Sequence, residues 1–240
     1  MQISIIIPMF NERKIIEATA KTLSDYMQAN FDSYEILFSD DGSTDGCGDL
    51  VRKLDLPYVR VVGYKENKGK GSAVRLGMME AKGDLVMFTD ADLAYGTNVI
   101  RTFYDAYCQE SSETAPHLFV GSRNLCKDGY SDYTVIRKIM SKVYLKILRI
   151  LGGLHLSDSQ CGCKAFRQDA AKEIFSRCTT DGFAFDFEAI LWSKQLGMRA
   201  KEIPVKIINH RESKIRYIHD TVKMLKDLRR IRKKIKKEIK

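Results

Sequence analysis

The sequence predicts a single α/β domain built on a mostly parallel, Rossmann-like sheet, followed by a basic amphipathic helix at the C-terminus. Three observations predict it. Short apolar runs of strand length alternate with segments of helical periodicity, acids and glycines follow the apolar runs, and Lys and Arg gather at the end of the chain. The 240 residues suffice for one large domain with its own core.

The first half of the chain alternates regularly. The run ISIII at 3–7 suits a central strand buried on both faces, and apolar residues at helical spacing follow it. Further strands are predicted at 34–38, 58–63, 84–89 and 118–121, with helices at 69–81 and 97–110. Strands that alternate with helices form parallel sheets with right-handed crossovers.

From residue 122 the pattern changes. A helix is predicted at about 135–151, and SDSQCGCKAF, a short helix, GFAFDFEAILWSKQLG and a strand at 200–208 follow it. No repeat, linker or low-complexity stretch interrupts the chain. We therefore expect one domain over 1–215 and a helical extension over 216–240.

The net charge of +9 belongs mainly to that extension. From Asp220 to Lys240 there are ten Lys or Arg and three acids, so the rest of the chain is nearly neutral and nucleic-acid binding is not expected. An apolar stripe runs along the helix at Ile218, Val222, Leu225, Leu228, Ile231, Ile235 and Ile239. It can pack on the domain, lie on an anionic membrane or form the seam of a homodimer. We expect packing for its first part and membrane contact for its last part, KKIKKEIK.

The location follows from what the sequence lacks. No run of eighteen apolar residues occurs, the start has no signal-peptide features, and the six cysteines are scattered. We expect a cytoplasmic protein that associates peripherally with a membrane.

Acids stand where the predicted strands end, which is where open parallel sheets bind ligands. Asp90 and Asp92 are two residues apart, so both carboxylates can face one Mg²⁺ or Mn²⁺, or they can simply cap a solvated turn. In DDGSTD, Asp41 can hold a base or ribose, or belong to an ordinary turn. In NKGKG, the glycines suit a helix start and Lys70 can reach a phosphate.

The motifs PMFNE, DDGSTD, NKGKGSAVRLG, DAD, GSR, DSQCGCKAF and FDFE, taken in order, resemble the family 2 glycosyltransferases of GT-A fold. The similarity is greatest to the branch that makes polyprenyl-phosphate sugars, and it extends from Ile3 to about Lys226. It implies a GT-A domain whose nucleotide-binding half is 1–121 and whose acceptor half is 122–215.

The resemblance also implies roles for individual residues. The nucleotide would be bound by Pro8, Asn11, Glu12, Asp41, Lys70 and Asp90, and the metal by Asp90 and Asp92. Phosphate and acceptor groups would be bound by Arg123, Arg137, Lys164, Asp186, Glu188 and Arg216. The catalytic residues would be Asp158, Asp92 and Arg123, where Asp158 orients the acceptor or accepts its proton.

The expected activity is an inverting transfer of a hexose from a nucleotide-sugar, most simply glucose from UDP-glucose, to a polyprenyl phosphate such as dolichyl or undecaprenyl phosphate. Two alternatives stay open. One is a GDP-mannose-dependent polyprenyl-phosphate mannosyltransferase, and the other is a family 2 transferase that acts on a polysaccharide or lipid hydroxyl.

Overall fold

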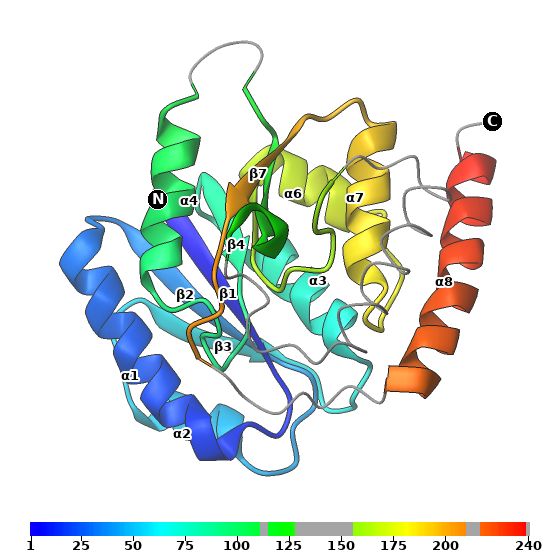
Figure 1. Cartoon of the computed structure of the whole chain (residues 1–240). Coiled ribbons are helices and arrows are strands. Elements are labelled where there is room, and N and C mark those ends of the chain that lie inside the picture. Colours follow the sequence, from blue (N-terminus) through cyan, green and yellow to red (C-terminus); the bar gives the residue numbers. More distant parts are fainter. Residues whose placement is uncertain (111–114, 128–155, 210–216, 239–240) are drawn as a thin grey trace.

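The computed structural model describes residues 1–110, 115–127, 156–209 and 217–238, with side chains of the last segment from residue 226 onward. Within these ranges the strands form one seven-stranded sheet in the order β3-β2-β1-β4-β6-β5-β7 (Figure 1). The strands are β1 (Ile3–Met9), β2 (Tyr34–Asp40), β3 (Val59–Gly63), β4 (Leu85–Phe88), β5 (Leu118–Ser122), β6 (Lys164–Arg167) and β7 (Ala200–Pro204). The predicted α/β class and mostly parallel sheet are confirmed.

Helices cover both faces of this sheet. They are α1 (Arg13–Asn30), α2 (Cys47–Lys53), α3 (Lys70–Glu80), α4 (Asn98–Cys108), α6 (Gln168–Phe175), α7 (Phe185–Gln195) and α8 (Tyr217–Glu238), with the 3₁₀ turn η1 (Arg123–Leu125) after β5. Along β1, Ile5 and Ile7 face the core beneath α1, α2 and α4, whereas Ile6 faces the core beneath α3, α6 and α7. A strand buried on both faces explains why ISIII is apolar throughout.

β6 is the one described strand that runs against its neighbours, and the sequence patterns did not predict it. It is antiparallel to both β4 and β5, while the other strand pairs are parallel. In this register Lys164, the first residue of β6, lies opposite Phe88 on one side and Val120 on the other. The start of β6 therefore lies at the edge where β4 and β5 end.

The predicted C-terminal helix is present as α8, and it lies beside α7 (Figure 1). Its apolar stripe does not face outward in the described part. Leu228, Ile231 and Ile235 are at most 4% exposed and join the core cluster that contains Trp192 of α7. The packing expected for the first part of the stripe is confirmed at Leu228 and Ile231. The membrane contact expected for KKIKKEIK is wrong at Ile235, because this side chain is buried against the domain and so is already removed from water.

Two expected segments differ in extent or fall outside the description. The strand expected at 200–208 ends at Pro204, the last residue that pairs with β5. The helix expected at 135–151 lies outside the described residues. In the parts of the chain that the structure describes, no helix combines the length and the apolar character needed to cross a membrane.

Candidate active site

The predicted acids meet at one edge of the sheet. β1, β2, β4 and β5 point the same way, so the loops that follow them emerge together. The segments after β1, β2 and β4 carry Glu12, Asp41, Asp90 and Asp92. Arg123 follows β5, the reversed strand β6 adds Lys164, and α7 adds Asp186. The acids that follow β1, β2 and β4 therefore lie at one edge of the sheet, and ligand binding at this edge stays a prediction.

Lys70 and Asp90 form an ion pair at the centre of this edge. The Lys70 Nζ atom lies 2.5 Å from Asp90 Oδ1, and both side chains are half-buried. Burial alone would lower the pKa of Lys70, but the charges of Asp90, Asp186 and Asp92 outweigh it and raise that pKa above its ordinary value. Lys70 is therefore a fixed cation beside the two acids predicted to hold a metal.

Asp92 and Gly162 complete the surroundings of Asp90. Asp92 Oδ1 accepts a hydrogen bond from the Ala94 amide at 3.1 Å, which fixes the turn after β4. Gly162 lies so close to Asp90 that a Cβ built there would overlap the Asp90 carboxylate. The glycine of DSQCGCKAF, Gly162, is therefore explained by its close approach to Asp90.

Lys164 and Asp186 form a second pair, deeper in the domain. Lys164 is fully buried, and its Nζ atom donates to Asp186 Oδ1 and to the Cys161 carbonyl, each at 2.6 Å. Burial raises the pKa of Asp186 above its ordinary value, although Lys164 and Lys70 act in the opposite direction. Because Asp186 faces both lysines, the two ion pairs form one chain of alternating charges.

Arg123 and Asp158 form a third, bidentate pair. Arg123 Nε lies 2.6 Å from Asp158 Oδ2 and Arg123 Nη2 lies 3.0 Å from Asp158 Oδ1, with both residues buried. Burial would raise the pKa of the Asp158 carboxyl, but the hydrogen bonds and charge of Arg123 hold it below its usual range. The two residues predicted separately from GSR and DSQ are thus partners of each other.

Asp41 organises the loop that leads into α3. Its buried carboxylate accepts hydrogen bonds from the Tyr64 hydroxyl at 2.5 Å, the Asn67 amide group at 2.8 Å and the backbone amides of Lys68 and Gly69 at 2.9–3.0 Å. These contacts satisfy the acid within the protein. Its predicted contact with a base or ribose stays a prediction.

The first loop joins the second through Asn11. The Asn11 amide donates to Ser43 Oγ, and its side-chain oxygen accepts from the Thr44 amide at 2.9 Å. Pro8 is buried near the end of β1, beyond the last pair with β4, where a missing amide donor is tolerated. Glu12 stands at the start of α1 and its carbonyl accepts from Ile16.

Among the described residues, Glu188 contacts the segment before α7 and not these ion pairs. Glu188 is buried on α7, and its carboxylate accepts from the amides of Thr179 and Thr180. Arg137 and Arg216 lie outside the described residues. Their predicted contacts with phosphate or acceptor stay predictions.

Two bracing residues were missed by the sequence reasoning. Tyr95 is buried beside Gly162, whose amide donates to the Tyr95 hydroxyl at 3.3 Å. Glu202 of β7 accepts from the Ser157 hydroxyl at 2.6 Å and thereby supports the residue before Asp158. An acid in the short strand AKEIP was the available signal for Glu202, but its partner depends on the three-dimensional fold.

The fold is that of GT-A glycosyltransferases. The crystal structure of glucosyl-3-phosphoglycerate synthase from Mycobacterium tuberculosis in complex with UDP superposes with a TM-score of 0.67 at 18% identity, covering 98% of this chain and 80% of that one. The family 2 glycosyl transferase model matches residues 4–175. The chain belongs to glycosyl transferase family 2 and is a glycosyltransferase.

Several proteins of similar sequence are dolichyl-phosphate beta-glucosyltransferases. The chain is 30% identical to a dolichyl-phosphate beta-glucosyltransferase of Saccharomyces cerevisiae, covering 94% of this chain and 72% of that protein. It is 27% identical to the dolichyl-phosphate beta-glucosyltransferase of Dictyostelium discoideum, covering 96% of this chain and 73% of that protein. The resemblance stated from the motifs is confirmed.

Gly162→Ala tests the close approach to Asp90. The added methyl group should displace the Asp90 carboxylate and weaken metal-dependent UDP binding by about tenfold or more, measured by calorimetry with Mn²⁺. The control is Gly197→Ala after α7, where a Cβ meets no atom within 4 Å and only the local backbone, with φ of 68°, is strained. Equal binding by both variants would contradict the assigned role of Gly162.

Asp158→Asn tests the buried pair with Arg123. Removing one partner leaves a buried charge, so the free energy of unfolding at pH 7 should fall by about 3 kcal/mol. Because the folded-state pKa of Asp158 is depressed, its stabilisation is present above about pH 4 and is lost as the pH falls further.

Denaturant unfolding at several pH values measures this effect. The wild-type protein should lose stability below about pH 4 more steeply than the variant does. Asp25→Asn, at an exposed position on α1, serves as the control. Parallel pH profiles for wild type and Asp158→Asn would show that the pair does not act as described.

Proposed function

We propose that this glycosyltransferase transfers glucose from UDP-glucose to a polyprenyl phosphate such as dolichyl phosphate, with inversion at the anomeric carbon. The observation that carries the proposal is the 30% identity to a dolichyl-phosphate beta-glucosyltransferase over 94% of the chain. The site geometry supports it. Acids and cations gather at the edge of the sheet where the parallel strands end, and open α/β sheets bind ligands at that edge.

The charges at the edge support a divalent metal. The three ion pairs and Asp92 together contain four carboxylates and three cations. A donor diphosphate adds further negative charge, so a cation at Asp90 and Asp92 would balance it. Within the described residues no three His, Cys, Asp or Glu side chains lie close enough to hold a metal.

Mg²⁺ or Mn²⁺ suits this donor set, because such ions are often held by one or two carboxylates together with substrate phosphates and water. Asp90 and Asp92 would hold the ion, which neutralises charge on the departing diphosphate when bound. Solved structures of the M. tuberculosis synthase contain Mn²⁺ and UDP-glucose, at 18% identity to this chain.

The acceptor chemistry needs little proton transfer. A lipid phosphate is already ionised near neutral pH, so its oxygen can attack the anomeric carbon directly and the diphosphate leaves from the opposite face. A single displacement on an α-linked donor gives a β-linked product. In this reaction the protein's own groups act by position and charge. Lys70, which pairs with Asp90, would contact the donor phosphates, and Arg123, held by Asp158, would contact the acceptor phosphate.

The Ser159 hydroxyl, next to Asp158 in the sequence, is a candidate contact for a bound ligand. Its hydroxyl oxygen is buried and finds no hydrogen-bond partner among the described residues. Buried hydroxyl groups are normally paired, so the partner of this one is a residue outside the described ranges, an ordered water or a bound ligand.

A second candidate is transfer to a hydroxyl acceptor. The observation that favours it is the raised pKa of Asp186, caused first by burial, because a raised pKa suits a general base. In that reaction Asp186→Asn would abolish transfer. With a phosphate acceptor the same variant would reduce transfer only through its effect on Lys164.

The exposed face of α8 supports peripheral attachment to an anionic membrane at the cytoplasmic face. Its exposed residues include Lys226, Arg229, Arg230, Lys233, Lys236 and Lys237. Since Leu228, Ile231 and Ile235 are buried, these cations would bind lipid headgroups by charge, without insertion of this part of the helix.

The donor assignment is tested by calorimetry of UDP, UDP-glucose and GDP-mannose with and without Mn²⁺, followed by transfer to dolichyl phosphate. Metal-dependent binding of UDP and UDP-glucose is expected. Asp92→Asn should weaken it by about tenfold or more, because a metal ligand is lost. Asp49→Asn, an exposed acid of α2, should leave it unchanged.

The other outcomes of this test are distinct. Binding of GDP-mannose in place of UDP-glucose would assign the mannosyl donor. Transfer to a sugar hydroxyl but not to dolichyl phosphate would assign the second candidate. Absence of nucleotide binding in either metal state would contradict the proposed function as a whole.

Membrane attachment is tested by sedimentation with vesicles that contain anionic lipid. The triple variant Lys233→Glu/Lys236→Glu/Lys237→Glu should bind at least about tenfold more weakly, because each basic residue contributes about 1 kcal/mol near the surface. Wild-type binding should also fall at about 0.5 M salt, where surface charges are screened. Binding that resists salt would instead indicate apolar insertion.

A further inference from the structure

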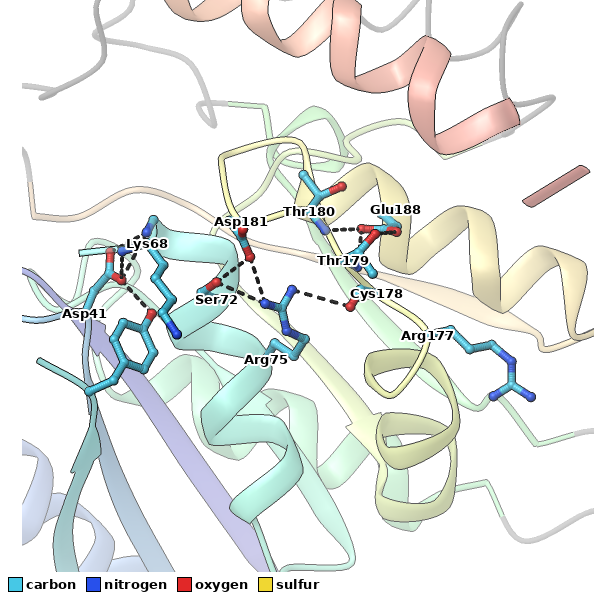
Figure 2. A network of polar contacts seen from close by, with 12 residues as sticks. Asp41, Lys68, Ser72, Arg75, Arg177, Cys178, Thr179, Thr180, Asp181 and Glu188 are labelled. Carbon is cyan, nitrogen blue, oxygen red and sulfur yellow. Dashed lines mark hydrogen bonds and ion pairs between the residues drawn. The ribbon is translucent and has the colours of Figure 1, made fainter. Parts of the chain in front are cut away.

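Residues 177–182, called the strap below, connect α6 to α7 and lie between the start of α3 and the helix α8. Figure 2 shows the polar contacts along this line, from Asp41 and Lys68 at one end, through Ser72, Arg75 and Asp181, to Glu188 at the other. None of the strap's residues was among the site residues expected from the sequence. Its contacts nevertheless reach the predicted nucleotide loop.

Asp181 caps the N-terminal end of α3 from a distant part of the chain. Its carbonyl oxygen accepts from the Gly71 amide at 2.8 Å. Its Oδ1 atom accepts from the Ser72 hydroxyl at 2.5 Å and from Arg75 Nη2 at 2.7 Å. The N-cap residue Gly69 has no side chain to satisfy the first amides of the helix, so Asp181 supplies part of that capping.

The glycines of the GKG sequence make this approach possible. A Cβ built at Gly69 would overlap the Asp181 carbonyl oxygen, and one at Gly71 would overlap that of Thr180. Gly69 also has φ of 121°, which other residues rarely adopt. These two glycines are therefore required by contact with the strap, whether or not a phosphate lies beside them.

The opposite side of the strap is held by α7 and α8. The Glu188 carboxylate accepts from the Thr179 amide at 3.0 Å and from the Thr180 amide at 2.7 Å. Lys234 of α8 donates to the Arg177 carbonyl at 2.6 Å and to the Thr179 hydroxyl at 3.2 Å. Lys234 Nζ is also 3.8 Å from the buried Glu188 carboxylate. The strap is thus fixed independently of α3.

The segment 68–72 is consequently anchored at three points. The amides of Lys68 and Gly69 donate to Asp41, and the Lys70 ammonium pairs with Asp90. The third anchor is Asp181, through Gly71 and Ser72. The first two anchors, Asp41 and Asp90, are residues predicted to contact the nucleotide and the metal. Lys70 is the first residue of α3, the helix that Asp181 caps, and its side chain reaches Asp90.

We propose that Asp181 is a positioning residue for binding of the nucleoside-diphosphate donor. By holding the first turn of α3 against the strap, it fixes Lys70 toward Asp90 and keeps the amides of residues 68 and 69 on Asp41. The proposal rests on the proposed function, because it assigns the nucleotide-sugar to this edge of the sheet. Asp181 itself need not touch the donor.

Asp181→Ala removes the carboxylate contacts to Ser72 and Arg75 and leaves the backbone contact to Gly71. The dissociation constant for UDP with Mn²⁺ should rise about tenfold, since contacts of a charged hydrogen-bond acceptor that orients the loop are lost. The KM for UDP-glucose should rise in parallel, while the KM for dolichyl phosphate should stay within about twofold. Calorimetry and initial-rate kinetics measure the two effects.

The matched control is Asp105→Ala on α4. The Asp105 side chain is 47% exposed and pairs with Arg101, as the Asp181 side chain is 49% exposed and pairs with Arg75, but it belongs to a helix on the other face of the sheet. Asp105→Ala should bind UDP as the wild type does. A role of Asp181 in stability alone would lower the melting temperature without a selective rise in the donor KM.

A second pair of variants tests the strap from the side of α8. It still tests the positioning role of the strap if Asp181→Ala does not fold. Lys234→Met should weaken UDP binding in the same direction, whereas Lys233→Met, at an exposed position of the same helix, should not. If the wild type binds UDP and Asp181→Ala and Lys234→Met bind it equally well, the proposal is overturned and the proposed function stands. If the wild type binds no nucleotide, both are overturned.

Discussion

The buried ammonium group of Lys164 is the constraint on which the site depends. An isolated charge in a protein interior costs several kcal/mol, so its partners must be held in place. Lys164 meets the Asp186 carboxylate and the Cys161 carbonyl, and its Nζ atom lies 5.5 Å from the centre of the Phe88 ring. These partners come from α7, the turn before β6, and β4. One cation therefore fixes three elements around the end of the central strands.

The other charged groups follow from this arrangement. Asp186 faces Lys70 as well as Lys164, and Lys70 pairs with Asp90, so the position of the predicted metal acids is linked to the core through alternating charges. Arg123 and Asp158 add a separate buried pair on the side of β5. Side chains held in such pairs are already oriented before a ligand binds, which in the proposed reaction reduces the reorganisation needed as negative charge develops on the departing diphosphate.

The sequence predicted the parallel sheet and the acids at the edge where its strands end. The apolar strand DLVMFT, for example, leads directly into Asp90. It could not predict β6, since KAFR has four residues and no clear periodicity, and its neighbours in the sheet are distant along the chain. For the same reason Arg123 and Asp158 were identified singly but not as a pair. The stripe of α8 was recognised, yet whether it covers a membrane or α7 depended on Trp192 and the core around it.

The close contact between the GKG glycines and the strap has a consequence for exchange of parts between relatives. Residues 69–71 and residues 180–181 are separated by more than a hundred positions in the sequence. They pack so closely that a side chain at Gly69 or Gly71 would overlap the backbone of residues 180 and 181. A chimaera that receives residues 69–71 and their flanking segment from another family member would carry only one side of this contact. Such a graft would require residues 177–182 to be transferred with it, so the two segments form a single unit for protein engineering.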